Sequence, residues 1–373
     1  MFNYYCLNPI AKVGLDKFTN EFAKTEDVNA AEGILVRSAA MHDMEFSDNL
    51  LAVARAGAGV NNIPLDECAK KGIVVFNTPG ANANGVKELV IAGMLLASRD
   101  IVGGIEWVKE NKDDSEIGKS AEKAKKAYAE TEVQDKKLGI IGLGAIGVKV
   151  ANVAKHMGME VYGYDPYVSV DAAWNLSRDV KHVTDVNEIY ANCDYITIHV
   201  PLNDATKNTV NKETLALCKD GIRILNFARG GLVNNDDIKE ALASGKAAAY
   251  VTDFPSDDVI GVDGVIAIPH LGASTPESED NCAMMAADEL IAYIEKGEII
   301  NSVNMPRMPL DNVDGARTCI ISKADAAEAV KAIAGADAKQ AVKGAIAYTV
   351  ADQELDADAL NAVDGVIKVR VIK

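Results

Sequence analysis

The sequence predicts an α/β protein with two doubly wound parallel-sheet domains and a small C-terminal α+β domain. Short runs typical of buried strands alternate with helical patterns through most of the 373 residues. A glycine-rich turn follows one of these strand patterns near residue 142. At roughly 100 to 200 residues per domain, a chain of this length corresponds to two or three domains.

The composition excludes several classes of partner. Lys and Arg total 38 and Asp and Glu total 55, so the formal net charge is −17 and the surface repels nucleic-acid phosphates and anionic lipids. The apolar stretch 89–97 is far shorter than the ~20 residues of a membrane helix. The first residues lack a basic start followed by an apolar segment, so we expect a cytoplasmic protein. The six cysteines show no CxxC spacing, and we expect neither disulfides nor a metal site.

The first hundred residues read as one small α/β unit. Strand patterns occur at 33–38, 51–56 and 73–77, and each is followed by a turn of Gly, Pro or polar residues. The apolar run 88–99 is typical of a buried helix that leaves this unit.

A second and larger sheet begins near residue 138. Seven strand candidates follow, at the segments that begin at residues 138, 160, 179, 194, 222, 247 and 265. A helical pattern at 277–294 then leads away, and the proline-containing segment 301–313 reads as a linker. The remainder, from about residue 316, has a strand and helix order like βαββαβ, in which we read 341–351 as one strand.

The glycine-rich turn is the strongest functional signal. Residues 142–147 read G-x-G-x-x-G, preceded by a strand pattern and followed by a helical one. In such a Rossmann-type unit Gly142 permits the tight turn, Gly144 lets the backbone approach a pyrophosphate, and Gly147 lets helix and strand pack closely. The intervening Ala145 and Ile146 begin the helix whose N-terminus faces the anion. The sequence therefore predicts a dinucleotide site.

Asp165 lies 23 residues after Gly142, at the end of the next strand pattern. A carboxylate there accepts hydrogen bonds from the ribose hydroxyls and repels a 2′-phosphate, which favours NAD over NADP. The alternative interpretation is a turn former, since Pro166 follows directly.

Two further residues follow later strands, at the sheet edge where ligands bind in this class of fold. Arg229 comes after the strand that begins at 222, and His270 after the strand that begins at 265. Oxidation of a 2-hydroxy acid needs a base near neutral pKa and a fixed cation for the carboxylate, tasks that suit His and Arg. A capping His and a surface Arg are the plain alternatives.

The segments LGIIGLGAIG, YGYDPY, HVPLNDATKN, NFARGGLVN and PHLGAST occur in this order and together resemble the D-isomer-specific 2-hydroxyacid dehydrogenases. The resemblance covers about residues 30–305 and is closest to members that oxidise D-3-phosphoglycerate to 3-phosphohydroxypyruvate with NAD. It implies that Arg229 holds the substrate carboxylate and that His270 is the general acid/base.

The resemblance implies further site residues. Those near the cofactor are His199, Val200, Pro201, Thr206 and Ala228. Those near the substrate are Arg37, Ser38, Gly59 and Asn62, with Arg37 matching a phosphate-binding position.

One departure concerns the carboxylate beside His270. The family has a Glu there, whereas residues 252–258 read TDFPSDD. We expect Asp257 to assist His270 and Asp253 to lie near the nicotinamide. Both could instead be exposed turn carboxylates.

The tail resembles a degenerate ACT domain without the residues that bind an amino acid. We therefore expect it to support oligomerisation, as a homodimer or homotetramer. The expected domains are a flavodoxin-like substrate domain, 1–99 with 283–305, a cofactor domain, 100–282, and the ACT-like domain, 314–373. The substrate lobe and the cofactor lobe are expected to close over the reaction. Two other functions remain open, a reductase of hydroxypyruvate or glyoxylate and an NAD(H)-sensing corepressor-like protein.

Overall fold

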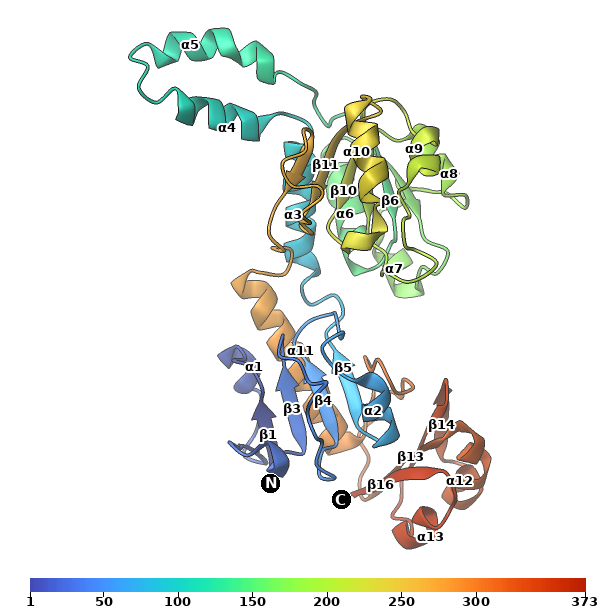
Figure 1. Ribbon diagram of the computed structural model, residues 1–373. Coiled ribbons are helices and arrows are strands. Elements are labelled where there is room, and N and C mark those ends of the chain that lie inside the picture. The colour runs from blue at the N-terminus through green and yellow to red at the C-terminus, as the bar shows by residue number, and fades with distance from the viewer. The chain divides into compact units, whose positions relative to one another are not determined.

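The computed structural model describes all residues, 1–373. It forms two compact units, one of residues 1–82 with 276–373 and one of residues 83–275. The predicted class is confirmed, with two parallel sheets and a small antiparallel one (Figure 1). The chain leaves the first unit after Asn82 and returns to it after Thr275, whereas the boundaries expected for the cofactor domain were residues 99 and 282. Helix α3 belongs to the second unit because its apolar face packs on the larger sheet.

The second unit is a seven-stranded parallel sheet with the order β12-β11-β10-β9-β6-β7-β8. All seven strand candidates of the sequence are present. The strands are β6 (Lys137–Ile141), β7 (Glu160–Tyr164), β8 (Lys181–His182), β9 (Tyr195–Ile198), β10 (Ile222–Asn226), β11 (Ala247–Thr252) and β12 (Val265–Ala267). The helices of this unit are α3 (Ala83–Leu96), α4 (Ile101–Glu110), α5 (Ile117–Ala124), α6 (Ala145–His156), α7 (Val170–Asn175), α8 (Asn187–Asn192), α9 (Lys212–Leu217) and α10 (Asn235–Ala243).

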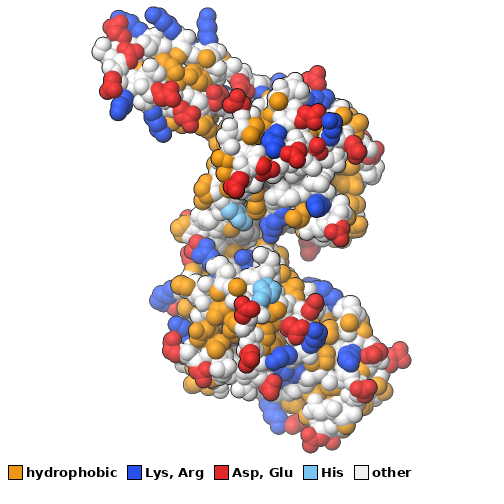
Figure 2. All heavy atoms as spheres, viewed as in Figure 1, with side chains coloured by type: hydrophobic (Ala, Val, Ile, Leu, Met, Phe, Trp, Pro, Cys, Tyr) orange, Lys and Arg blue, Asp and Glu red, His pale blue; other side chains and the backbone are white.

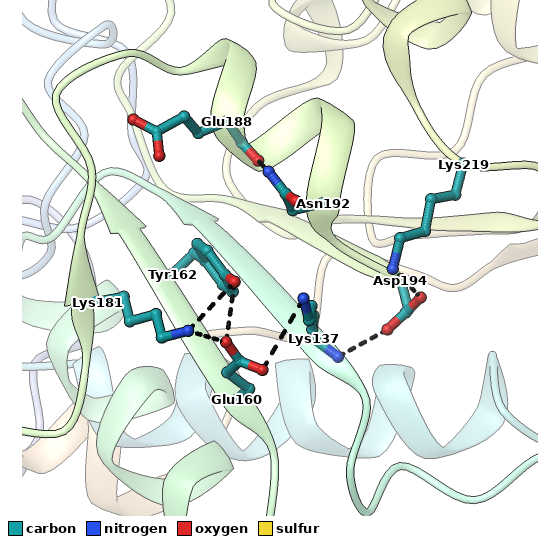
Figure 3. A network of polar contacts seen from close by, with 8 residues as sticks. All are labelled: Lys137, Glu160, Tyr162, Lys181, Glu188, Asn192, Asp194 and Lys219. Carbon is teal, nitrogen blue, oxygen red and sulfur yellow. Dashed lines mark hydrogen bonds and ion pairs between the residues drawn. The ribbon is translucent and has the colours of Figure 1, made fainter.

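Charged side chains close the amino end of this sheet (Figure 3). Glu160, the first residue of β7, pairs with Lys181 and accepts a hydrogen bond from the Tyr162 hydroxyl at 2.9 Å. Asp194 accepts from the Lys137 backbone N–H and from Lys219 Nζ, both at 2.8 Å. These contacts hold strand beginnings together, and the loops at the opposite, carboxyl end carry the predicted site residues.

The first unit contains a five-stranded parallel sheet with the order β2-β1-β3-β4-β5. Its strands are β1 (Phe2–Cys6), β2 (Phe22–Lys24), β3 (Gly33–Val36), β4 (Ala52–Arg55) and β5 (Val74–Asn77). The last three were predicted, whereas β1 and β2 were missed. β2 is a three-residue edge strand, and β1, which pairs with β2 and β3, lies among polar residues and tyrosines instead of an apolar run. The helices are α1 (Lys12–Leu15), α2 (Leu65–Lys70) and the long α11 (Pro276–Lys296), which packs on β4 and β5.

The C-terminal residues of the same unit form a four-stranded antiparallel sheet with the order β14-β15-β13-β16. Its elements are β13 (Arg317–Lys323), α12 (Ala327–Ala334), β14 (Lys339–Lys343), β15 (Ile346–Ala351), α13 (Ala357–Asn361) and β16 (Val366–Ile372). The single strand expected at 341–351 is wrong, because Gly344 adopts a φ of 59° and turns the chain into a hairpin. The likeness to an ACT domain stays a prediction.

This small sheet is docked on the end of α11. Arg317 Nη1 donates to the Lys296 carbonyl at 2.8 Å, and Tyr348 donates to the Gly297 carbonyl at 2.7 Å. Arg370 donates to the Tyr293 carbonyl and lies over its ring. Arg317 and Tyr348 satisfy carbonyls that the helix end leaves without backbone partners, whereas the Tyr293 carbonyl also accepts from the Gly297 N–H. None of the helices of the chain has the length and apolar composition that crossing a membrane requires.

Candidate active site

The predicted dinucleotide turn has the required shape. Gly142 follows β6 with a φ of 98°, and a Cβ on it would lie 2.7 Å from the His199 carbonyl oxygen. A Cβ on Gly147 would lie 2.0 Å from the Gly142 carbonyl oxygen, so helix α6 can approach the turn only without a side chain there. A Cβ on Gly144 would meet nothing within 4 Å. The turn therefore leaves open space at the N-terminus of α6, where a pyrophosphate fits.

Asp165 lies directly beside this turn. Its Oδ2 accepts a hydrogen bond from the Leu143 backbone N–H at 2.9 Å, and its Oδ1 accepts from the Tyr167 N–H at 2.8 Å. These bonds aim the carboxylate along the glycine turn, at the position where a ribose hydroxyl would donate to it. The glycine turn and the Asp165 carboxylate therefore fit NAD. No group of three or more His, Cys, Asp or Glu side chains in the chain could hold a metal ion.

The segment after β9 borders the same turn. The carbonyl of His199 and the side chain of Val200 are the atoms that a Cβ on Gly142 would meet. Burial lowers the pKa of the His199 imidazole to about 4, so the ring is neutral, and Thr197 contacts its Nε2 at 3.0 Å. Thr206 donates to the Pro201 carbonyl and so holds the loop that follows.

Arg229 follows β10 and is positioned by a buried amide. Asn226, the last residue of β10, donates through Nδ2 to the Arg229 carbonyl at 2.8 Å and accepts from the Ala228 N–H at 3.2 Å. Arg229 Nη1 donates to the Ala228 carbonyl at 2.7 Å. The turn is thus braced on both sides, which holds the guanidinium at the carboxyl end of the sheet.

His270 and Asp253 line one cavity of about 600 Å³ in this unit, together with the ring of Phe254. The rings of Phe254 and His270 lie 4.6 Å apart between centroids. Asp253 is 1% exposed, and its Oδ2 accepts from the Gly272 N–H at 3.2 Å, whereas its Oδ1 is buried without a partner. Burial raises the pKa of the Asp253 carboxyl, and the positive charges of His270 and Arg229 oppose that rise.

The structure does not join Asp257 to His270. Asp257 is exposed, and no hydrogen bond or ion pair connects it to the imidazole. The neighbouring Asp258 is occupied elsewhere, since it accepts from Ser256 at 2.6 Å and from Asn235 at 3.1 Å. Of the two expected carboxylates, Asp253 is the one that interacts electrostatically with His270.

The predicted substrate residues lie in the first unit. Arg37 follows β3, and its Nη2 forms an ion pair with Glu279 Oε1 at 2.6 Å. Asn62 donates through Nδ2 to the Ala39 carbonyl at 2.8 Å and so holds the loop that contains the exposed Ser38. Gly59 is half-buried in the turn after β4. Sequence reasoning missed Glu279, although its place in the first turn of α11, nine residues after His270, was a usable signal.

Comparison with known proteins places these features in a family. Residues 91–272 match the model of the D-isomer specific 2-hydroxyacid dehydrogenase, NAD binding domain. A protein of Methanocaldococcus jannaschii named D-3-phosphoglycerate dehydrogenase is 36% identical over 298 residues, which are 77% of this chain and 54% of that protein. One of the same name in Bacillus subtilis is 34% identical over 296 residues, again 77% and 54%. The chain thus spans about half the length of these relatives.

Solved structures share the fold. The NAD+-bound 3-phosphoglycerate dehydrogenase of Entamoeba histolytica superposes with a TM-score of 0.62 at 24% identity, covering 83% of this chain and 99% of that one. A glyoxylate reductase from Paecilomyes thermophila superposes with a TM-score of 0.67 at 21% identity, covering 81% and 98%. The chain belongs to the D-isomer-specific 2-hydroxyacid dehydrogenases, and residues 91–272 are its NAD-binding domain.

Proposed function

We propose that this protein oxidises D-3-phosphoglycerate to 3-phosphohydroxypyruvate with NAD, and catalyses the reverse reaction. The observation that carries the proposal is the grouping of Arg229, Asp253 and His270 after three neighbouring strands, β10, β11 and β12. A carboxylate-binding cation and a proton acceptor at one sheet edge are what a 2-hydroxy acid requires. The names of the relatives at 34% and 36% identity support the phosphorylated substrate.

Each residue has one task in this reaction. Arg229 pairs with the substrate carboxylate, and its braced backbone fixes the direction of the guanidinium. Neutral His270 takes the proton of the substrate hydroxyl as its O–H bond breaks. When bound, NAD would supply the acceptor for the hydride on the carbon that bears this hydroxyl, so that a carbonyl forms. In the reverse direction protonated His270 returns the proton to the carbonyl oxygen.

We assign the positioning of His270 to Asp253 in place of Asp257. A buried carboxylate that lacks a partner on Oδ1 and interacts with the imidazole can stabilise its protonated form. In this role Asp253 acts through His270. Arg37 is assigned to the phosphate of the substrate, because a planar fork matches phosphate oxygens.

We further propose that the protein is a cytoplasmic homo-oligomer, with a dimer as its smallest form. Helix α4 has no buried residue, and Ile101, Ile105 and Val108 are each more than 40% exposed on it. Figure 2 shows hydrophobic side chains gathered on the α4–α5 hairpin among charged ones. A second copy of the chain is the occupant that we expect for this face, and the mass measured by light scattering tests it.

The pairing of Arg37 with Glu279 gives a specific reason to keep a second candidate function. If Arg37 serves only that ion pair, the protein is a reductase of hydroxypyruvate or glyoxylate, with the same Arg229 and His270. NADH oxidation with phosphohydroxypyruvate, hydroxypyruvate and 2-oxoglutarate, compared side by side, tests the proposal. Preference for phosphohydroxypyruvate supports it, and preference for hydroxypyruvate favours the alternative. No turnover with any of the three would favour an NAD(H)-sensing binding protein.

A further inference from the structure

The ion pair between Arg37 and Glu279 joins two elements that are 242 residues apart in sequence. Arg37 lies at the carboxyl end of β3, and Glu279 lies in the first turn of α11. The distance between Nη2 and Oε1 is 2.6 Å, and the two side chains are 42% and 41% exposed. The pair therefore lies at a surface that water and a small anion can reach.

The backbone beneath Arg37 is held independently of this ion pair. The amide oxygen of Asn8 accepts from the backbone N–H groups of Arg37, Ser38 and Ala39, at 3.0, 3.1 and 3.0 Å. Arg55, the last residue of β4, donates through Nε to the Arg37 carbonyl at 3.0 Å. Loss of Glu279 therefore leaves the position of the Arg37 backbone unchanged, and only the partner of the guanidinium changes.

We propose that Glu279 is a specificity-determining residue, which occupies the Arg37 guanidinium until the phosphate group of the substrate displaces it. The inference rests on the proposed function, because that proposal assigns Arg37 to the phosphate. A phosphate ester carries a charge of about −1.5 to −2 at pH 7 and offers three acceptor oxygens, whereas a carboxylate carries −1. A dianion therefore competes for Arg37 more effectively than a second carboxylate does.

The consequence is a filter on ligand charge. An acid without a phosphate gains nothing at Arg37, because Glu279 already satisfies that cation at close range. A phosphorylated acid gains the contact but must first displace Glu279, whose charge then repels it. Glu279 thus lowers the affinity for phosphorylated ligands while it keeps weaker anions away from Arg37.

The test compares Glu279→Gln with Glu277→Gln. Both substitutions remove one negative charge from the first turn of α11, but Glu277 is exposed and forms no ion pair with Arg37. The first measurement is isothermal titration with inorganic phosphate. Exposed ion pairs contribute about 0.2 to 1 kcal/mol, so at 1.4 kcal/mol per decade Glu279→Gln should bind phosphate about 1.4- to 5-fold more tightly. Glu277→Gln should match the wild type.

The second measurement is NADH oxidation. Glu279→Gln should raise kcat/KM for phosphohydroxypyruvate by the same factor, through a lower KM. The value of kcat/KM for hydroxypyruvate should not change. When Arg37→Ala is already present, adding Glu279→Gln should change kcat/KM for neither substrate. If Glu279→Gln does not fold, Glu279→Ala removes the same charge without adding an amide.

The two proposals fail in different ways. Tighter phosphate binding in Glu279→Gln without turnover of phosphohydroxypyruvate in the wild type would uphold the filter and reject the proposed function. Turnover in the wild type with phosphate binding unchanged or weaker in Glu279→Gln would reject the filter and leave the proposed function intact. An equal gain in Glu277→Gln would also reject it, because the effect would then be one of net charge.

Discussion

Asp253→Asn is the substitution that most directly probes the proton-transfer site. It removes a buried negative charge that interacts with His270 and keeps an acceptor oxygen for the Gly272 N–H. The other groups that face this carboxyl are Arg229 and the buried phenol of Tyr250, and neither changes. We therefore expect the pH dependence of turnover to move to lower pH, because the protonated imidazole of His270 loses an opposite charge that interacts with it.

The magnitude follows from the surroundings of the pair. An opposite charge within about 4–6 Å shifts a pKa by roughly 1 to 3 units. Asp253 is buried but His270 is exposed to solvent, so we take the low end of this range, about one unit, for the movement of the pH profile. Reduction needs protonated His270, so the pH above which kcat/KM for phosphohydroxypyruvate declines should move down by about one unit. Oxidation needs neutral His270, and its rise with pH should begin about one unit lower.

Asp257→Asn is the matched control, since it is the same chemical change on an exposed side chain four residues later. Its pH profile should match the wild type, and NADH binding, followed by fluorescence, should remain in both variants. A profile that moves in Asp257→Asn and stays in place in Asp253→Asn would refute the assignment and identify Asp257 as the partner of His270. A loss of activity in Asp253→Asn without any movement of the profile would mean that its role is structural.

Four other predictions follow from the same structure. His270→Ala and Arg229→Ala should each lower kcat about 10²- to 10⁴-fold with Tm and NADH binding retained, and an undiminished kcat in His270→Ala would end the proposed role. Asp165→Ala should weaken the binding of NAD and reduce the preference for NAD over NADP, which a comparison of kcat/KM with the two cofactors measures. A wild type that prefers NADPH would contradict the assignment. Gly147→Ala should weaken NADH binding at least tenfold, since its Cβ would lie 2.0 Å from the Gly142 carbonyl oxygen. A fluorescence titration that gives the wild-type affinity for NADH would contradict this role of Gly147. Burial raises the pKa of Glu289 from 4.5 to about 8, so the folded state holds a proton that the unfolded state loses. Stability should therefore fall as pH rises between these values, and Glu289→Gln should flatten the curve of Tm against pH.

The sequence by itself determined the features that depend on neighbouring residues. The glycine turn at 142–147 requires small residues at set spacing, and the strand before it and the helix after it can be read from local periodicity. Asp165, Arg229 and His270 were found because each directly follows a strand pattern, and in a parallel sheet the ends of strands share one edge. The same reasoning missed β1 and β2, because β2 has only three residues and β1 has a single buried residue, so neither has a strong apolar pattern.

Only the tertiary structure decided which charged groups meet. Asp253 and Asp257 look equivalent in the sequence TDFPSDD, but β11 ends so that Asp253 is buried beside the loop of His270 and Asp257 turns outward. The pairing of Arg37 with Glu279 depends on α11 packing against the five-stranded parallel sheet, a contact between distant parts of the chain. Electrostatic partners are set by distance and burial in space, and neither quantity is encoded in the spacing of residues along the chain.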